Sequence, residues 1–262
     1  MNVAEDISKL YARLDDLCHI CDRGEVGVSD FLSPRELHFA ESYLLRRGVK
    51  FLSFGGYDGA ERKRIYLLPE YMEDVAHLSE LEDYGHSVSI SALDVSSAGY
   101  RKLSHRDYLG SILGLGVDRA VVGDILVIGE DGASAVIFCD RPLASFFCSE
   151  LTKVANEKVK CRSVELDKIS VPERRMAAIN DTVASPRVDC VIGAVCSTSR
   201  EKARILVESG VVEVDFETEQ RPDRLIKAPC TVSVRGVGRF RIISVEDKTK
   251  KGRYRLVAEK FL

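Results

Sequence analysis

The sequence predicts an α+β protein of three small modules, covering residues 1–85, 86–183 and 184–262. A chain of 262 residues of which 45% are hydrophobic can bury one large core or two to three small ones. Short helices and short strands follow one another along the chain, separated by capping and turn residues. The two parts of the chain also differ in net charge. Residues 185–262 carry 16 Lys and Arg against 11 Asp and Glu, whereas residues 1–184 carry 22 Lys and Arg against 30 Asp and Glu. A basic module on an acidic body suggests one surface that faces a polyanion.

The first module is predicted to be an α/β module of two helices and two strands. Leucines at helical spacing indicate a helix over about residues 4–21. Ser33 followed by Pro34 is typical of a helix start, and Gly48 of a helix end, which predicts a second helix to Arg47. Alternating patterns then predict two strands on either side of a glycine turn, at 49–54 and 62–68.

The middle module has a cleaner order of elements. The predicted elements are, in chain order, a strand at 87–95, a helix at 104–115, strands at 124–129 and 133–140, a helix at 142–156 and a strand at 161–169. This βαββαβ order is that of ferredoxin-like and RRM-like folds. Residues 133–138 contain one aromatic side chain, so stacking of bases on this sheet is not expected, while contact with RNA backbone or protein stays open.

The third module contains the most informative segment, residues 199–214. Ser199 is a good N-cap, and Gly210 stands where a helix must end. Arg200 and Arg204 are one turn apart, so both project from one face beside the helix start, where phosphate groups bind well. Four strands are predicted to follow, at 211–216, 230–234, 238–245 and 254–258. The module therefore consists of two short helices followed by a small, mostly antiparallel sheet, and RNA is the first ligand to consider.

Membrane, disulfide and metal-binding classes are not supported. No apolar run approaches the roughly 20 residues that span a bilayer, and the acidic N-terminus lacks the features of a signal peptide, which predicts a cytoplasmic protein without a membrane partner. Cys18 and Cys21 form a lone C-x-x-C inside an apolar helical stripe, and the eight cysteines are expected to be reduced core residues. The five histidines fall at no metal-ligand spacing.

No catalytic constellation stands out either. The tripeptide at 105–107 spells the kinase His-Arg-Asp, but the Asn and the Asp-Phe-Gly that kinases require are missing. Arg187-Val188-Asp189 is similar to the catalytic Asp motif of pseudouridine synthases, but it lies where the third module begins its first helix. We therefore expect a protein that is not an enzyme, with no cofactor and no small-molecule substrate. An RNA-modifying enzyme with a catalytic centre in the middle module remains an alternative.

Several segments of the third module resemble the S-four RNA-binding domain, which is named for the small-subunit ribosomal protein in which it occurs. The matching segments are 187–189, 199–204, 210–214 and Val234-Arg235-Gly236-x-Gly238-Arg239-Phe240. Two positions depart from that pattern, because Asp215-Phe216 stands where Asn followed by an aromatic residue or glycine is usual, and Ala228-Pro229 where Gly-Asp is usual. An extra carboxylate at Asp215 is expected to weaken affinity for phosphate.

Segments of the other two modules resemble the YlmH family of bacteria. They are 31–36, 54–56, 60–64, 105–110 and 123–125, with 247–251 near the end of the chain. This resemblance spans nearly the whole chain in colinear order. It implies binding to the large ribosomal subunit and to peptidyl-tRNA, in a quality-control step that steadies a P-site tRNA on a stalled subunit. It also implies an indirect link to cell division, so a division scaffold with incidental RNA binding is a further alternative.

The candidate RNA-binding residues follow from these patterns and from the resemblance. The main set is Arg187, Ser199, Arg200, Lys202, Arg204, Arg235, Arg239, Arg241, Lys248, Lys250 and Lys251. Arg235, Arg239 and Arg241 alternate, which predicts that they share one strand face. A secondary RNA or ribosome contact is predicted at Arg62, Lys63, Arg64, His105 and Arg106. Plain solvated surface is the alternative for both the terminal lysines and the secondary set.

Overall fold

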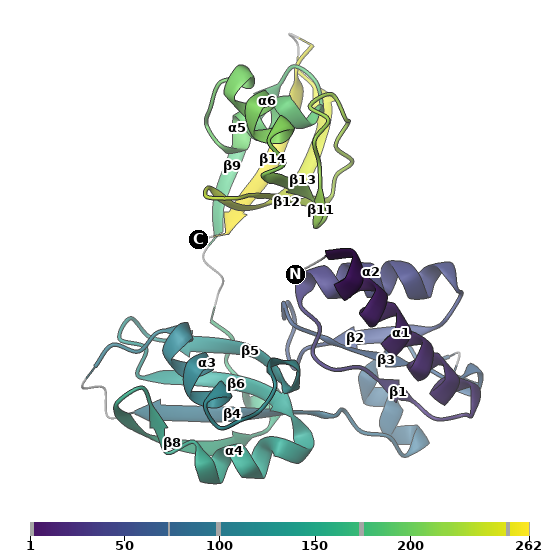
Figure 1. Ribbon diagram of the computed structural model, residues 1–262, viewed down its shortest axis with the longest axis vertical. Helices are drawn as coiled ribbons and strands as arrows, with labels where there is room; N and C mark the ends of the chain where they lie inside the picture. The colour runs from purple at the N-terminus through teal and green to yellow at the C-terminus, as the bar shows by residue number, and fades with distance from the viewer. Residues whose placement is uncertain (1–2, 73, 98–100, 173–175, 250–251, 262) are drawn as a thin grey trace. The chain divides into compact units, whose positions relative to one another are not determined.

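The computed structural model describes residues 3–72, 74–97, 101–172, 176–249 and 252–261 (Figure 1). The chain divides into two compact units, an N-terminal unit of residues 1–172 and a C-terminal unit of residues 173–262. Within the described ranges, none of the helices has the length and apolar character needed to cross a bilayer.

The N-terminal unit contains two sheets and four α-helices within its described residues. Its elements are α1 (Val3–Asp22), β1 (Gly27–Val28), α2 (Pro34–Arg46), β2 (Phe51–Phe54), β3 (Arg64–Leu67), β4 (Ile90–Ser97), α3 (His105–Leu113), β5 (Val122–Ile128), β6 (Ser134–Asp140), α4 (Ala144–Glu150), β7 (Lys153–Val154) and β8 (Glu157–Val164), with short 3-10 turns between some of them.

The first sheet has the order β1-β3-β2 and packs against α1 and α2. Leu10, Leu14 and Cys18 recur every four residues of α1 and are buried, which explains how the predicted apolar stripe holds the helix on the sheet. The start of α2 is also as predicted, because Ser33 and Glu36 form a reciprocal capping box with Pro34 in the first turn.

The second sheet has the order β5-β6-β4-β8-β7, with every neighbouring pair antiparallel. The first long strand, β4, lies between the third and the last, which is the strand order of a ferredoxin-like βαββαβ fold. The helix predicted at 142–156 is too long, since α4 ends at Glu150. The chain then turns through Ala155 and Asn156 into a β7–β8 hairpin, so the last strand begins at Glu157 instead of residue 161.

The two sheets of the N-terminal unit pack into one body instead of two separate modules. The buried Arg64 of β3 pairs with Asp140 at the end of β6. Gly56, at the predicted glycine turn, has φ +104°, and a Cβ there would come within 2.7 Å of Phe138 Cε1 of β6. The glycine therefore serves the close approach of the first sheet to the second. The chain between β3 and β4 does not separate two compact units.

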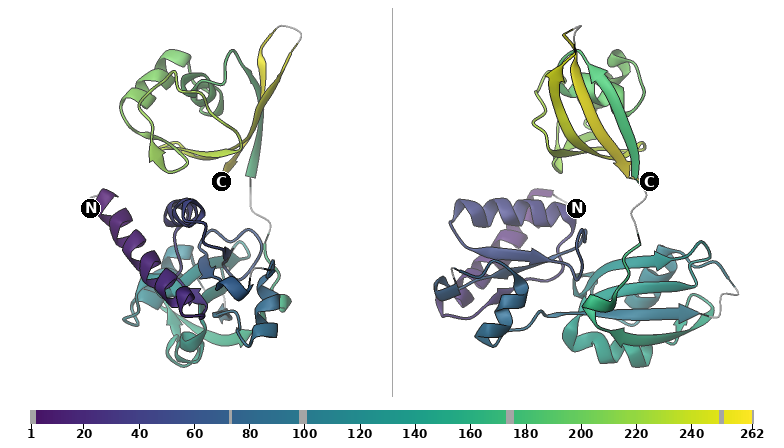
Figure 2. Two further views of the ribbon diagram at one scale, coloured as in Figure 1. Left: turned by 90° about the vertical axis from the view of Figure 1, so that its right-hand side faces the viewer. Right: turned by 180° about the vertical axis from the view of Figure 1, so that it is seen from behind.

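The C-terminal unit is a six-stranded antiparallel sheet with two helices on one face (Figure 2). Its elements are β9 (Met176–Val183), α5 (Val188–Val195), α6 (Arg200–Glu208), β10 (Val212–Val214), β11 (Glu217–Thr218), β12 (Cys230–Val234), β13 (Gly238–Lys248) and β14 (Tyr254–Phe261). The sheet order is β11-β10-β12-β13-β14-β9.

The boundary predicted between residues 183 and 184 is displaced. Strand β9 pairs antiparallel with β14 along its whole length, from Val183 opposite Tyr254 to Met176 opposite Phe261, and so belongs to the C-terminal sheet. The division of the chain into compact units falls after Pro172. The local sequence could not reveal this, because the partner of β9 lies at the far end of the unit.

The core of the C-terminal unit lies between the sheet and its two helices. Phe240 and Ile242 of β13 are fully buried and belong to one cluster with Ile192 of α5 and Val207 of α6. Because side chains alternate along a strand, the neighbours of Phe240 and Ile242 point to the other face of the sheet. This alternation decides where the predicted arginines lie.

Candidate nucleic-acid interface

The start of α6 presents a basic, solvent-exposed surface. Ala203 and Val207 fix the buried side of the helix, and the Ser199 hydroxyl caps it by accepting from the Lys202 backbone N–H at 3.3 Å. Arg200, Lys202 and Arg204 are exposed, and we call these three residues the α6 surface. Arg204 Nε donates to Glu208 Oε1 at 2.7 Å, one turn further along the helix. The sequence predicted a helix capped by Ser199 with basic side chains on one face near its start, and the structure agrees with this prediction.

A buried carboxylate holds two of the predicted arginines in place. Asp189 is 2% exposed, and its Oδ2 accepts from Arg200 Nε at 2.9 Å. Arg187 reaches the same carboxylate, with Nε 3.2 Å from Oδ1. Burial raises the pKa of Asp189, but the hydrogen bonds from Arg200 and Arg187 outweigh it and leave the pKa below its ordinary value. The two guanidinium groups are thus oriented before any ligand arrives.

A loop that the sequence did not single out repeats this arrangement. In the Glu219 loop (residues 219–226), the carboxylate of Glu219 is 3% exposed and accepts from the guanidinium groups of Arg221 and Arg224. The loop is tied to the start of α5, whose Val188 and Asp189 N–H groups donate to loop carbonyls at 2.9 and 3.0 Å. In the sequence, the spacing Glu-x-Arg-x-x-Arg could have indicated that one carboxylate contacts two arginines. The same residues are also typical of a charged, solvent-exposed turn.

These two buried carboxylates give the C-terminal unit an acid-sensitive stability. The pKa of Glu219 is also lowered, since the hydrogen bonds from Arg224 and Arg221 exceed the opposing effect of burial. A carboxyl whose folded pKa is depressed stabilises the fold above its unfolded pKa, about 3.9 for Asp and 4.3 for Glu, and loses that contribution as pH falls through the folded value. We expect urea denaturation of the C-terminal unit to shift to lower urea between pH 5 and pH 3, and Asp189→Asn to show a smaller shift. An equal shift in the variant would contradict this assignment.

The arginines of the sheet lie away from the α6 surface. Arg239 and Arg241 of β13 stand opposite Ser233 and Thr231 of β12, on the face turned away from the helices. Arg235 lies in the turn between β12 and β13, so the prediction that three arginines share one strand holds for two of them. Arg235 and Arg239 line a hollow of about 460 Å³ that also contains a carboxylate, that of Glu213.

The main set also contains three lysines near the end of the sequence. Lys248 is the last residue of β13, and its side chain is outside the described part. Lys250 and Lys251 lie outside the described residues altogether. Asp215, which departs from the S-four pattern, forms with Phe216 a two-residue turn in which both have positive φ. Its carboxylate accepts from the Thr231 N–H at 2.8 Å and so serves the sheet.

Two residues of the predicted secondary set are committed to the interior of the N-terminal unit. Arg64 is 7% exposed, donates to the Ser29 and Ser89 carbonyls and pairs with Asp140, so the predicted RNA contact there is wrong. Arg62 is half-buried and donates to the Val122 and Phe31 carbonyls at 3.0 and 2.6 Å. Burial lowers the pKa of Arg62, which reflects this internal use.

The other three residues of that set differ in exposure. His105 and Arg106 are exposed in the first turn of α3, while the Lys63 backbone pairs with Leu32 next to β3. Partial desolvation of the His105 imidazole by its neighbours and the nearby charge of Arg119 lower the pKa of His105. The structure therefore gathers no single basic surface from the five residues.

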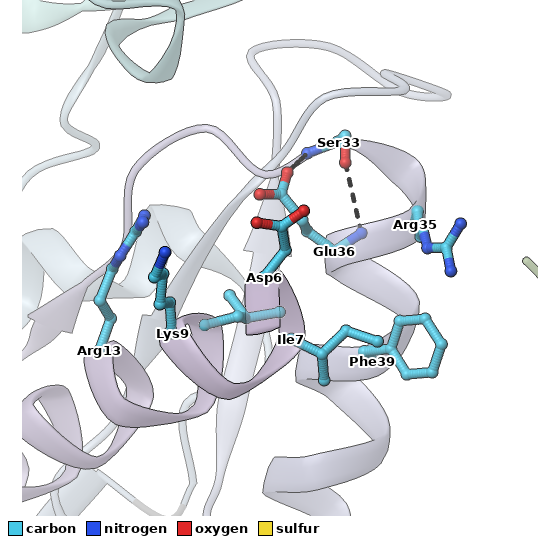
Figure 3. Close-up of a pocket in the computed structure, with 9 residues that line it drawn as sticks. Asp6, Ile7, Lys9, Arg13, Ser33, Arg35, Glu36 and Phe39 are labelled. Carbon is cyan, nitrogen blue, oxygen red and sulfur yellow. Dashed lines mark hydrogen bonds between the residues drawn. The ribbon is translucent and has the colours of Figure 1, made fainter. Parts of the chain in front are cut away.

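A separate hollow of about 370 Å³ lies between α1 and the start of α2 (Figure 3). It combines cations such as Arg13 with carboxylates such as Asp6. Ser33 and Glu36, which also line it, are engaged in the capping box of α2. Within the described residues, no group of three or more His, Cys, Asp or Glu is arranged to hold a metal ion.

The C-terminal unit is thus a small α+β module that presents pre-oriented arginines at a helix start. Comparison with known proteins then identifies the family. Residues 5–72 match the model described as "YlmH, N-terminal", and residues 82–168 match "Putative RNA-binding domain in YlmH". The "Ribosome-associated protein quality control protein P2" of Bacillus subtilis (strain 168) is 31% identical over 234 residues, which cover 89% of this chain and 86% of that relative. The chain belongs to the YlmH family.

A solved structure agrees with this fold. The "Cell division protein ylmH from Streptococcus pneumoniae" superimposes with a TM-score of 0.51 at 21% sequence identity. The match covers 65% of this chain and 97% of that one. At this identity the likeness concerns the fold alone.

Proposed function

We propose that this chain binds structured RNA through the α6 surface together with Arg187, and that it does so as a ribosome-associated factor. One observation carries the proposal, namely that the buried Asp189 fixes the Arg187 and Arg200 guanidinium groups beside the capped start of α6. Fixed, forked cations next to helix N–H groups match phosphate oxygens and position an RNA backbone without reading its sequence. The family relative named for ribosome-associated quality control supports the same role.

The finer parts of the proposal rest on the resemblance to the YlmH family. We propose docking on the large ribosomal subunit, contact with its rRNA and with peptidyl-tRNA, and stabilisation of P-site tRNA on stalled ribosomes. In this proposal the protein is non-catalytic, takes no small-molecule substrate and works in the cytoplasm, where ribosomes are. We propose that the C-terminal unit is an S-four-type RNA-binding domain, in which Ser199 belongs to the same contact as the α6 surface. Arg235, Arg239 and Arg241 lie away from α6 and are proposed as an additional contact of this domain.

The cleanest test uses Lys202→Gln with Arg204→Gln. These side chains are exposed, and Arg204 forms its ion pair with the surface residue Glu208, so the double substitution takes no partner from a buried carboxylate. We expect affinity for rRNA purified from large subunits to fall about tenfold, and the slope of log affinity against log salt to decrease by roughly 1.4 to 1.8. Binding assays over a range of salt concentrations measure both quantities.

The matched control is Lys9→Gln with Arg46→Gln, which removes the same charge from exposed positions of α1 and α2. If both double variants bound rRNA equally well, the proposed RNA surface would be wrong. Co-sedimentation with separated ribosomal subunits tests the finer proposal. We expect the protein to pellet with large subunits. Pelleting with small subunits alone would contradict the proposed docking on the large subunit.

A further inference from the structure

The sheet of β4, β5, β6 and β8 has one face that is only partly covered. Its helix side packs against α3 and α4 through residues such as Val159 and Cys161 of β8. On the opposite face, Phe31 and Tyr57 pack over Ala92 and Phe138. In Figure 2 (right), where the molecule is seen from behind, this face is turned toward the viewer and α3 and α4 lie on the far side of the sheet. In an RRM-like sheet this is the surface on which bases stack, and here the Phe138 ring is already stacked on Tyr57 at 4.9 Å.

The uncovered part of this face carries a row of three cations on β8. Lys158, Lys160 and Arg162 alternate with the helix-side residues Val159 and Cys161, and all three are exposed. We call them the β8 cation row. Alternate residues on a strand stand about 6.6 Å apart, so the three charges form a line along one edge of the face.

The surroundings of this row leave an excess of positive charge. Lys160 stands opposite Ser96 of β4, and Ser96 stands opposite Ser134 of β6, so two hydroxyl-bearing residues extend the row across the sheet. Arg162 donates to Asp94 Oδ2 at 2.7 and 2.9 Å, which orients its guanidinium and uses the carboxylate facing it. The hollow beside Arg162, about 440 Å³, also holds Lys168, which pairs with Glu165.

This concentration of cations contrasts with the rest of the N-terminal unit. Residues 1–172 carry 20 Lys and Arg against 28 Asp and Glu, a net charge of −8. Like charges spaced along one exposed strand repel one another unless an anion neutralises them. On an acidic unit, a segregated positive row of this kind marks the place where a polyanion can approach.

We infer that the β8 cation row is a second RNA-backbone contact, separate from the α6 surface and situated in the N-terminal unit. The inference rests on the proposed RNA-binding function and adds a site to it. The row lies within residues 82–168, the part that matches the family's RNA-binding model, and it locates the contact on the uncovered part of the sheet. The ligand is a run of phosphates bound by charge, not bases bound by stacking, so the contact is independent of sequence.

The test compares Lys158→Gln with Lys160→Gln against the control pair Lys9→Gln with Arg46→Gln in the full chain. All four positions are exposed, belong to the same unit and lose the same charge. Arg162 is left unchanged because Asp94 depends on it. With rRNA purified from large subunits as the probe, we expect the β8 variant to bind several-fold more weakly than the control, with a salt slope lower by roughly 1 to 2.

A third variant separates failure of this inference from failure of the proposed function. If Lys202→Gln with Arg204→Gln weakens binding while the β8 variant matches the control, the second site is wrong and the proposed function stands. If the α6 variant also matches the control, the proposed function is wrong. An unchanged rRNA affinity together with lost co-sedimentation on intact large subunits would overturn the inference in favour of a protein contact.

Discussion

Replacing Arg187 and Arg200 together by Met is expected to destabilise the C-terminal unit by about 1–3 kcal/mol, because it leaves a buried carboxylate without its hydrogen-bonded partners. The full loss of a buried ion pair is not expected, since both arginines are partly exposed to solvent. The side chain of Asp189 is 3% exposed and is paired with both arginines. Met retains the apolar stems of the two side chains, so the loss isolates the charges. Urea titration read by hydrogen exchange of the β12 and β13 amides measures the effect in this unit alone.

The matched variant adds Asp189→Asn to the same double substitution. Removing the buried charge is expected to restore most of the lost stability, since replacing all members of an ion pair costs far less than removing one side of it. If the triple variant were no more stable than the double, Asp189 would not be the source of the loss. The consequence for binding studies is direct, because a weakened RNA affinity in Arg200→Glu combines a lost contact with a disturbed fold.

Gly56→Ala is expected to destabilise the N-terminal unit by about 2–5 kcal/mol. The added Cβ would overlap the Phe138 ring, which costs about 1–3 kcal/mol in a packed core, and φ +104° adds backbone strain of about 1–2 kcal/mol. Phe138 is fully buried and stacked on Tyr57, so its ring cannot turn aside without moving Tyr57. Hydrogen exchange of the β6 amides in increasing urea measures the loss.

Gly59→Ala is the control for this substitution. Gly59 has a similar positive φ of +82°, but a Cβ there meets nothing within 4 Å. It should therefore show the backbone cost alone, and Gly56→Ala should be less stable than Gly59→Ala by the steric part. Equal stabilities of the two variants would mean that the sheets of the N-terminal unit do not approach as closely as described.

Local signals in the sequence predicted most elements, while long-range pairing was beyond them. The capping residues Ser33 and Ser199 placed the starts of α2 and α6 correctly, because a cap is a contact within four residues. The predicted helix continued past the end of α4 at Glu150, because Leu151, Val154 and Ala155 also fit helical spacing although Val154 belongs to the β7–β8 hairpin. Strand β9 was missed because its partner, β14, lies at the other end of the unit.

The candidate site was predictable only in part for the same reason. Exposed cations on α6 follow from helical periodicity, but the anchoring of Arg187 and Arg200 by one carboxylate depends on tertiary packing. The charged sequence at 62–64 suggested a surface, yet Arg64 is buried because its ion partner, Asp140, arrives from another sheet. The role of Glu219 was not predictable, because its loop is held in place by hydrogen bonds to the start of α5, more than 25 residues earlier in the chain.

Because β14 lies inside its sheet, the sheet of the C-terminal unit can be completed only after this strand has been synthesised. This strand lies between β13 and β9, and Thr182 and Arg253, which are in contact at its edge, are 71 positions apart in the chain. Because translation delivers the chain from its N-terminus, β9 leaves the ribosome long before the strand that will pair with it. Contacts between positions so far apart also form slowly. A protein proposed to serve stalled ribosomes thus completes its own basic unit only when the last strand has been made, whereas every described element of its acidic unit precedes β9.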